Sequence, residues 1–345
     1  MKTQNRVFFP VVPILLTLTL LTSQAGGQVS QSTGSAASET NTKWAPVNAA
    51  GRFHPREEAS FIKCGDLMYL LGGRGIQAVD IYNPKTKSWS AGAPPPVEIH
   101  HFQAVAWKGR IYVAGALTGV YPTEPPLGNI YIYDPAKDKW STGASIPPSR
   151  RRGGAGTVVH GGKLYLVAGI KNGHTDGWVN WFDSYDFATD KWTALPDAPR
   201  ARDHFEAAVI AGKLYAVGGR RSSAVTNQVF DLTVPEIDVF DFSKSAWTTL
   251  PIKDNIPTLR AGASTVIVGQ SLVVVGGEST RQLPAHTEVE AFDTIRQEWR
   301  TLPALSEGRH GTGTVNFDGA LYTCAGAGNR GGSPLVISIE SLKLH

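Results

Sequence analysis

The sequence predicts an all-β protein that repeats one antiparallel four-stranded unit six times, and three observations support this. A short apolar run ending in two small residues recurs six times. An aromatic residue stands seven positions before a tryptophan five times. Charged residues make up 18% of the 345 residues and there are 37 Gly, which argues against a coiled coil or a bundle of long helices.

The first repeated half-unit is a pair of short strands joined by a Gly-centred turn. In one copy the first strand is 155–160, the turn is 161–162, and the second strand ends at the small residues of 165–169. Successive copies lie 43, 53, 50, 58 and 49 residues apart. The six endings are 69–73, 112–116, 165–169, 215–219, 273–277 and 322–326.

The second half-unit contributes the third and fourth strands of each copy. Segment 236–240 is a third strand, and a turn such as 83–86 leads to a fourth strand that opens with Trp. The loop between the half-units varies in length, so two constant pieces alternate with one variable connection. The aromatic–tryptophan pairs are Tyr82/Trp89, Tyr133/Trp140, Tyr185/Trp192, Phe240/Trp247 and Phe292/Trp299.

Together these half-units resemble Kelch repeats, and the resemblance covers residues 44–345. It implies a six-bladed β-propeller in which each blade is a four-stranded sheet. The sixth copy reaches His345 without a Trp, whereas Trp44 stands ahead of the first copy. We therefore expect an N-terminal strand to complete the last blade, because this pairing removes both free sheet edges.

Residues 1–25 are typical of a secretory signal peptide. Lys2 and Arg6 form a positive start, 7–21 is mostly apolar, and small residues at 23 and 25 suit a signal peptidase. The apolar run is too short for a comfortable membrane span. Residues 26–43 have the composition of a flexible linker. We expect a secreted or periplasmic protein without a membrane span after cleavage.

The charge balance and the two cysteines restrict the partners. Without Lys2 and Arg6 the mature chain has 31 basic and 29 acidic residues, a net charge of +2. This balance does not suggest a nucleic-acid partner, and we expect a monomer. Cys64 and Cys324 both lie in strand-like runs, where we expect buried, unpaired thiols.

A basic position recurs sixteen residues before the first small residue of each copy, and we call its arginines the Arg ring. The second copy has Ile99 instead. Strand reversal places this position and the variable loops on one face, the loop face. Guanidinium groups there suit carboxylates, phosphates or acidic sugars, although pairing with third-strand acids such as Asp80 and Asp183 is equally open. The candidate ligand-binding residues are Arg56, Arg152, Arg202, Arg260, Arg309, His100, His101, His204, His310, Trp178 and Arg220.

Loop 278–286 supplies candidates for catalysis and for metal binding. Similarity to the bacterial N-acetylneuraminate epimerases, which are Kelch propellers, suggests Glu278 as acid/base group and Arg281 as cation for a sugar carboxylate. Similarity to the iron loop of plant specifier proteins makes Glu278 and His286 the candidate metal ligands, although that family has an acid where this chain has Gln282. Two ligands are a poor site, so we expect no metal and no other cofactor.

Two main functions remain open from the sequence. The first is a secreted binding module that holds a glycan or a peptide or protein ligand on the loop face. The alternative is a sugar-active enzyme that uses Glu278, Arg281 and the Arg and His residues of the channel mouth. Such an enzyme would be a mutarotase or epimerase, because the tyrosines and cysteines that a galactose-oxidase-like copper site needs stand at strand positions. A third option is a protein scaffold whose channel mouth is filled by its own Arg–acid pairs.

Overall fold

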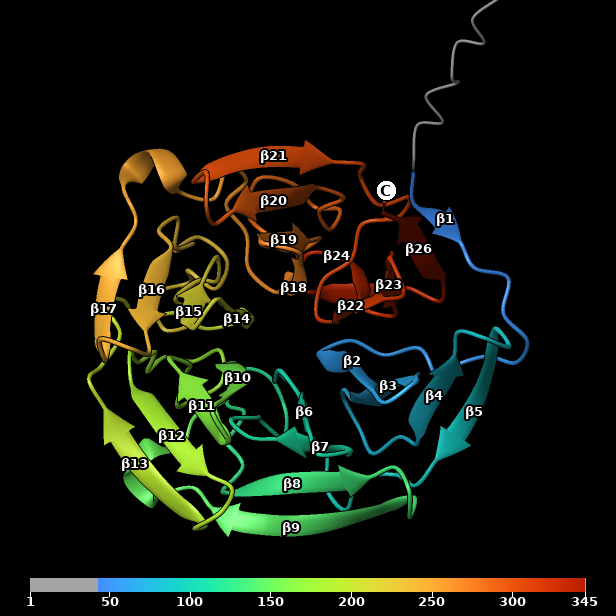
Figure 1. Ribbon diagram of the computed structural model, residues 1–345, viewed down its shortest axis with the longest axis horizontal. Helices are drawn as coiled ribbons and strands as arrows, with labels where there is room; N and C mark the ends of the chain where they lie inside the picture. Colours follow the sequence, from blue (N-terminus) through green and yellow to red (C-terminus); the bar gives the residue numbers. More distant parts are fainter. Residues whose placement is uncertain (1–42, 345) are drawn as a thin grey trace, which may run out of the picture. The chain divides into compact units, whose positions relative to one another are not determined.

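A computed structural model describes residues 43–344 as a closed ring of six four-stranded antiparallel sheets (Figure 1). The predicted all-β, six-bladed β-propeller is therefore confirmed. Two short 3₁₀ helices, η1 (Pro148–Arg150) and η2 (Ile252–Asp254), lie in connections between blades. Among the described residues, no helix is long and apolar enough to cross a membrane. The predicted signal peptide and nearly all of the linker lie outside the described residues.

The first three blades follow the chain in order, each with its first strand nearest the centre (Figure 1). Blade 1 contains β2 (Ala59–Cys64), β3 (Leu67–Gly72), β4 (Val79–Asn83) and β5 (Ser88–Gly92). Blade 2 contains β6 (Val105–Trp107), β7 (Arg110–Val113), β8 (Asn129–Asp134) and β9 (Lys139–Ser145). Blade 3 contains β10 (Gly156–His160), β11 (Lys163–Val167), β12 (Phe182–Asp186) and β13 (Lys191–Leu195).

The next two blades repeat this order, and the sixth is assembled from both ends of the described chain. Blade 4 contains β14 (Ala207–Ile210), β15 (Lys213–Ala216), β16 (Asp238–Asp241) and β17 (Ala246–Thr249). Blade 5 contains β18 (Ser264–Val268), β19 (Ser271–Val275), β20 (Val289–Asp293) and β21 (Glu298–Leu302). Blade 6 contains β22 (Thr314–Phe317), β23 (Ala320–Cys324), β26 (Ile339–Lys343) and β1 (Ala45–Pro46), with a hairpin of β24 (Ala327–Asn329) and β25 (Gly332–Leu335) in its loop.

The N-terminal strand closes the ring as the sequence predicts. β1 pairs antiparallel with β26, through Ala45 opposite Ser341 and Pro46 opposite Glu340. Trp44 is only 2% exposed and belongs to an apolar cluster with Leu305 and Leu342. β26 is therefore paired on both sides, with β1 and β23, and is not an edge strand of blade 6.

The turn between the third and fourth strands explains the repeated aromatic–tryptophan spacing. In blade 1 the Asn83 side chain accepts the backbone N–H groups of Lys85 and Thr86, which fixes a tight turn. That turn places Tyr82 directly opposite Trp89, with ring centroids 4.9 Å apart. An Asp takes the place of Asn83 in blades 2–5, and the corresponding aromatic pairs have centroids 5.2–5.3 Å apart.

Both cysteines serve as core residues. Cys64 and Cys324 are buried and do not form a disulfide, in agreement with the expectation. Burial raises the pKa of the Cys64 thiol, and it also raises the pKa of the Cys324 thiol. Each thiol lies in one of the apolar clusters that fill the spaces between neighbouring blades.

Candidate functional site

The Arg ring is built into the blades. Arg260, for example, donates to the Glu290 carboxylate at 2.5 Å and to the carbonyls of Thr258 and Val274. Its four counterparts make the same kind of bridge between the end of the second strand and an acid of the third strand. The other pairs are Arg56–Asp80, Arg152–Asp183, Arg202–Asp238 and Arg309–Glu340.

These contacts match the alternative in which the arginines pair with third-strand acids. All five side chains are at most 2% exposed, and their guanidinium groups donate to their own blades. Blade 2 replaces both partners, because Ile99 and Tyr131 stand at the two positions and belong to one buried apolar cluster. The Arg ring therefore stabilises the blades, and ligand binding by these arginines stays a prediction.

A second ring lies two residues beyond the first, and we call it the αL ring. Its six residues all have a left-handed backbone, with φ between 53° and 65°, and they surround the channel. Five of them donate their N–H to the carbonyl of the preceding blade's member at 2.7–3.0 Å, and the Ala59 N–H closes the circle onto the Gly311 carbonyl in place of Glu58. The members are Glu58, His101, Gly154, His204, Gly262 and Gly311.

Three members of the αL ring are not glycine, although the conformation favours glycine. A left-handed non-Gly residue costs on the order of 1 kcal/mol and persists where the surroundings demand it. Glu58, His101 and His204 are thus strained residues whose side chains lie at the channel mouth, a combination typical of functional sites.

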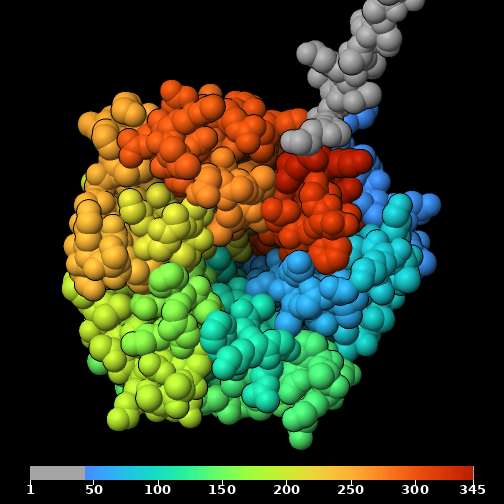
Figure 2. All heavy atoms as spheres, viewed as in Figure 1, coloured from blue at the N-terminus to red at the C-terminus, as the bar shows by residue number. Residues whose placement is uncertain are grey.

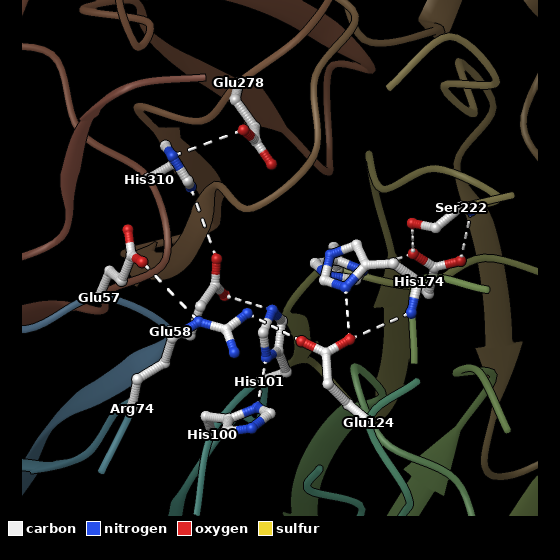
Figure 3. A network of polar contacts seen from close by, with 12 residues as sticks. Glu57, Glu58, Arg74, His100, His101, Glu124, His174, Ser222, Glu278 and His310 are labelled. Atoms are coloured by element: carbon white, nitrogen blue, oxygen red, sulfur yellow. Dashed lines mark hydrogen bonds and ion pairs between the residues drawn. The ribbon is translucent and has the colours of Figure 1, made fainter. Parts of the chain in front are cut away.

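Around these three residues lies a continuous cluster of charged and imidazole groups, the central polar network (Figure 3). Its members come from the strand entries, from the positions after the small pairs, and from the variable loops of blades 2, 3 and 4. They are Glu57, Glu58, Arg74, His100, His101, Glu124, His174, Asp203, His204, Arg220, Ser222, Glu278 and His310.

Imidazoles dominate one half of the network. His174 Nδ1 lies 2.7 Å from a Glu124 oxygen, and His204 Nδ1 lies 2.5 Å from an Asp203 oxygen. His101 joins them, with ring centroids 5.1 Å from His174 and 4.8 Å from His204. Three buried imidazoles from three blades are therefore in mutual contact.

Ion pairs dominate the other half of the network. Glu278 pairs with Arg220, accepts the Gly331 N–H at 2.7 Å, and lies 3.5 Å from His310 Nε2. Glu58 lies between the halves, 3.3 Å from His101 Nε2 and 3.8 Å from His310 Nδ1. The two halves form one connected system because Arg220 also reaches His174 Nε2 at 3.3 Å.

Burial and neighbouring charges set the protonation of the network. Burial would raise the pKa of Glu278, but His310 and Arg220 lower it to about 2. The pKa of Glu124 is likewise lowered to about 2 by His174 and Arg74, against the effect of burial. Burial and the neighbouring imidazoles hold the pKa of His101 well below its usual value, so this ring is neutral at pH 7.

The loops of blades 2 and 3 hold their network residues by backbone contacts. His174 N–H donates to the Pro122 carbonyl at 2.8 Å, which ties the two loops together beside Glu124. At Gly173, φ is +59°, and a Cβ would stand 2.5 Å from the Glu124 nitrogen. This close approach requires glycine and fixes His174 against Glu124.

The channel opens in the hollow where the blades meet (Figure 2), and it contains two spaces, of which the αL ring lines the smaller. A cavity of ≈ 40 Å³ is lined by Glu58, His101 and His204, together with Phe205 and Glu206. A wider cavity of ≈ 440 Å³ lies among the first strands and shares Glu206 with the smaller one. Burial raises the pKa of Glu206 to about 8.

The structure brings together six of the candidates named from the sequence: His100, His101, His204, His310, Arg220 and Glu278. Trp178 is 40% exposed on the loop face, and Arg281 is also exposed. His286 is bonded to Ser279 and Glu288, and the groups that could hold a metal do not include it.

The candidates from the sequence did not include seven network residues, which are Glu57, Glu58, Arg74, Glu124, His174, Asp203 and Ser222. Glu58 was detectable, because it shares a repeat position with His101 and His204 at which the other copies have Gly. Glu124 lies in a variable loop without a repeat position, so the sequence carried no signal for it.

The fold and the buried polar network define this protein as a β-propeller with a polar site at the channel mouth. The family model described as the KLHDC2/KLHL20/DRC7 Kelch-repeats domain matches residues 148–326, and the Kelch motif model matches residues 99–147. The first model spans half of the chain, so the chain belongs to the Kelch-repeat family. Members of this family act broadly as binding modules or scaffolds.

Known proteins of this family are distant in sequence. Kelch-like protein terF of Aspergillus terreus is 29% identical over 305 residues, which cover 82% of this chain and 64% of that protein. Human Kelch-like protein 23 is 25% identical over 268 residues, covering 75% of this chain and 43% of that protein. The chain thus spans less than two thirds of the length of these curated relatives.

One solved structure supports the fold. The structure of YjhT matches this chain with a TM-score of 0.71 and 17% identity, and the match covers 84% of this chain and 95% of that one. At this identity the similarity concerns the propeller architecture.

Proposed function

We propose that the chain is an exported binding module that holds a peptide segment of another protein on the loop face. One observation carries this proposal. Of the eleven exposed large hydrophobic residues among the described ones, ten lie in connections that strand direction places on this face. A partner that covers this face would therefore bury most of the exposed apolar side chains of the described residues. The ten residues are Ile76, Val120, Tyr121, Trp178, Val225, Ile252, Leu259, Leu283, Leu335 and Ile337.

Several of these residues suit peptide binding in particular. Trp178 is 40% exposed and lies near the Arg221 guanidinium, 5.6 Å from the ring centroid. Tyr121 is 52% exposed and packs against His174 at the edge of the central polar network, with tilted rings whose centroids are 5.2 Å apart. Exposed Trp, Tyr and Arg are the side chains that contribute most binding energy at protein interfaces. Ile295 is the one exposed large hydrophobic residue of the described part that is not on the loop face, because it lies in the turn between β20 and β21 on the opposite face.

The proposal is tested by selecting displayed random peptides on the protein and measuring their affinities. Selected peptides should bind the wild type and lose at least about tenfold affinity for the triple variant Tyr121→Ser, Trp178→Ser, Val225→Ser. The matched control is Ile295→Ser, which removes an exposed apolar side chain from the opposite face and should bind like the wild type. Equal binding to the triple variant, or binding of glycans in place of peptides, would overturn the proposal.

The enzyme alternative has less support from the geometry. It requires Glu278 and Arg281 to act on one substrate. Glu278 is buried with both oxygens occupied by Arg220, His310 and the Gly331 N–H, whereas Arg281 is exposed. Catalysis by this pair stays a prediction from the sequence.

A further inference from the structure

Three histidines from separate blades meet at the channel mouth. His101 and His204 are members of the αL ring in blades 2 and 4, and His174 reaches them from the loop of blade 3. One nitrogen from each ring lies within 4.8 Å of the other two. All three side chains are at most 7% exposed. Imidazole is the most frequent protein ligand of transition metals.

The hydrogen bonds of two of these histidines fix which nitrogen is free. Ionised carboxylates only accept hydrogen bonds, so the Nδ1 atoms of His174 and His204 donate to Glu124 and Asp203, respectively. In the neutral ring the lone pair is then on Nε2. Metal-binding histidines typically have this arrangement, with one nitrogen on the metal and the other donating to a carboxylate.

In His101 the lone pair is also on Nε2, because its Nδ1 donates a hydrogen bond to His100. The Gly119 carbonyl can only accept, so His100 donates to it from Nε2, over 3.1 Å. The neutral His100 ring therefore accepts at Nδ1, and His101 Nδ1 donates to it over 2.6 Å. The lone pair of His101 is thus also on Nε2.

Two of these three Nε2 atoms lack a hydrogen-bond partner within the described part of the chain. Those of His101 and His204 are buried without a hydrogen bond. His101 Nε2 faces a Glu58 oxygen at 3.3 Å, although both atoms are acceptors. His174 Nε2 accepts a hydrogen bond from the Arg220 guanidinium at 3.3 Å, and a metal ion would replace this donor. Burying unpaired acceptors is costly, and a cation would remove this cost.

Backbone strain at the same residues is an independent observation. His101 and His204 have φ of 54° and 53°, while the blade between them has Gly154 in the αL ring. Replacing each histidine with glycine would relieve strain. Both histidines therefore bear a cost that a bound ligand would offset.

We propose that His101, His174 and His204 bind a divalent transition-metal ion through their Nε2 atoms. Neutral nitrogen ligands select Zn²⁺, Fe²⁺, Co²⁺, Ni²⁺ or Cu²⁺ over Mg²⁺ and Ca²⁺. Nitrogens bound to zinc at about 2.0–2.1 Å lie about 3.3 Å apart, so the three rings move closer together on binding. The sequence-based expectation of no metal considered loop 278–286 and a copper site of tyrosines and cysteines, and it differs because the sequence did not place His101, His174 and His204 together.

Three protein ligands leave a coordination position for a water or a ligand atom. The cavity of ≈ 40 Å³ lined by Glu58, His101 and His204 is large enough for a water molecule. The Glu58 carboxylate next to His101 can accept a hydrogen bond from a water bound there. The three proposed ligands are not among the ten exposed apolar residues of the proposed peptide surface, although Tyr121 of that surface contacts His174. The two proposals are tested by different variants, so either can fail without the other.

The test uses the untagged full chain, stripped with a chelator and titrated with Co²⁺. One equivalent should bind, with visible ligand-field absorption that excess Zn²⁺ abolishes. His174→Gln and His204→Gln should each weaken binding at least about 100-fold, and Asp203→Asn, which changes a positioning residue, about 10- to 100-fold. The matched control His286→Gln removes another buried histidine and should leave the affinity within about twofold.

Circular dichroism and thermal melts confirm that each variant is folded. His174→Gln is the decisive variant because His174 lies in a loop outside the strands. The proposal is overturned if folded His174→Gln binds Co²⁺ like the wild type, or if His286→Gln abolishes binding. It is equally overturned if the stripped wild type binds none of Co²⁺, Zn²⁺, Fe²⁺, Ni²⁺ and Cu²⁺ stoichiometrically.

Discussion

At the scale of single residues, the Arg ring shows how a buried charge is tolerated when all its neighbours belong to the same blade. Each guanidinium joins the end of the second strand to an acid of the third strand, so its desolvation is offset by several charge-assisted bonds. Blade 2 shows the other solution, in which both members are replaced by the apolar residues Ile99 and Tyr131. A charged residue that recurs from blade to blade can therefore stabilise the fold without contacting a ligand.

The first prediction concerns the Arg260–Glu290 pair. Glu290→Ala should lower the free energy of unfolding by about 3–5 kcal/mol, because Arg260 is left buried and unpaired. The double variant Arg260→Ile, Glu290→Tyr copies the pair of blade 2 and should lose less than the single variant. Urea unfolding measures both. A double variant less stable than Glu290→Ala would show that blade 5 cannot accommodate an apolar pair.

The second prediction concerns Glu57 and pH. Burial and Glu58 raise the pKa of Glu57 to about 7. The folded protein therefore holds a proton that the unfolded chain releases near pH 4.5, and stability falls as pH rises from about 4.5 to 7, by at most about 3 kcal/mol. Glu57→Gln should remove this loss and be more stable than the wild type at pH 8.

Urea midpoints at pH 4 and pH 8 check the Glu57 prediction. The control is Glu298→Gln, which changes an exposed strand residue and should follow the wild-type pH dependence. If the wild type and Glu57→Gln respond to pH in the same way, Glu57 titrates normally.

At the scale of elements, the αL ring links the six blades by backbone hydrogen bonds and also presents side chains to the channel. Its geometry is the same in every blade, but only Glu58, His101 and His204 carry side chains with charge or lone pairs. Regular backbone thus positions an irregular set of functional groups, which is how repeat folds host varied sites.

The third prediction isolates the strain at Glu58, where φ is 54°. Both Glu58→Gly and Glu58→Ala lose the contacts of the carboxylate, so their difference reports the backbone alone. The Gly variant should be more stable than the Ala variant by about 1 kcal/mol. At Lys63, an exposed position inside β2, the order should reverse. Thermal or urea unfolding of the four variants measures these differences in stability. If Glu58→Ala is as stable as Glu58→Gly, the backbone at position 58 is not strained.

At the scale of the whole molecule, stability depends on closing a circle. The pairing of β1 with β26 covers the outer side of β26. An open ring would expose that edge to other chains. Trp44 stabilises the pairing of β1 with β26, because its side chain is almost fully buried in the apolar cluster of blades 5 and 6.

The fourth prediction follows from this closure. Trp44→Ala should lower the free energy of unfolding by about 3–5 kcal/mol, and should raise amide hydrogen exchange selectively in β26. Trp299→Ala removes a comparable ring from a blade whose strands are contiguous in sequence and should leave exchange in β26 unchanged. Equal protection of β26 in both variants would show that the closure does not depend on Trp44.

The sequence by itself determined the architecture. Small-residue endings and aromatic–tryptophan pairs arise from local turns and cross-strand contacts within a blade, so they recur at constant spacing. The same periodicity revealed that the sixth copy lacks its fourth strand and that the segment after Trp44 replaces it. It also marked His100, His101, His204 and His310 as residues of the channel mouth.

Only the tertiary structure decided what these residues do. A repeat position states where a side chain starts but not whether it turns into its blade, as the Arg ring does, or over the channel, as His101 does. Glu124 and His174 come from loops without periodicity, and they join His204 only because the ring brings blades 2, 3 and 4 together. Contacts across a closed ring depend on the relative positions of whole blades, which no local pattern in the chain encodes.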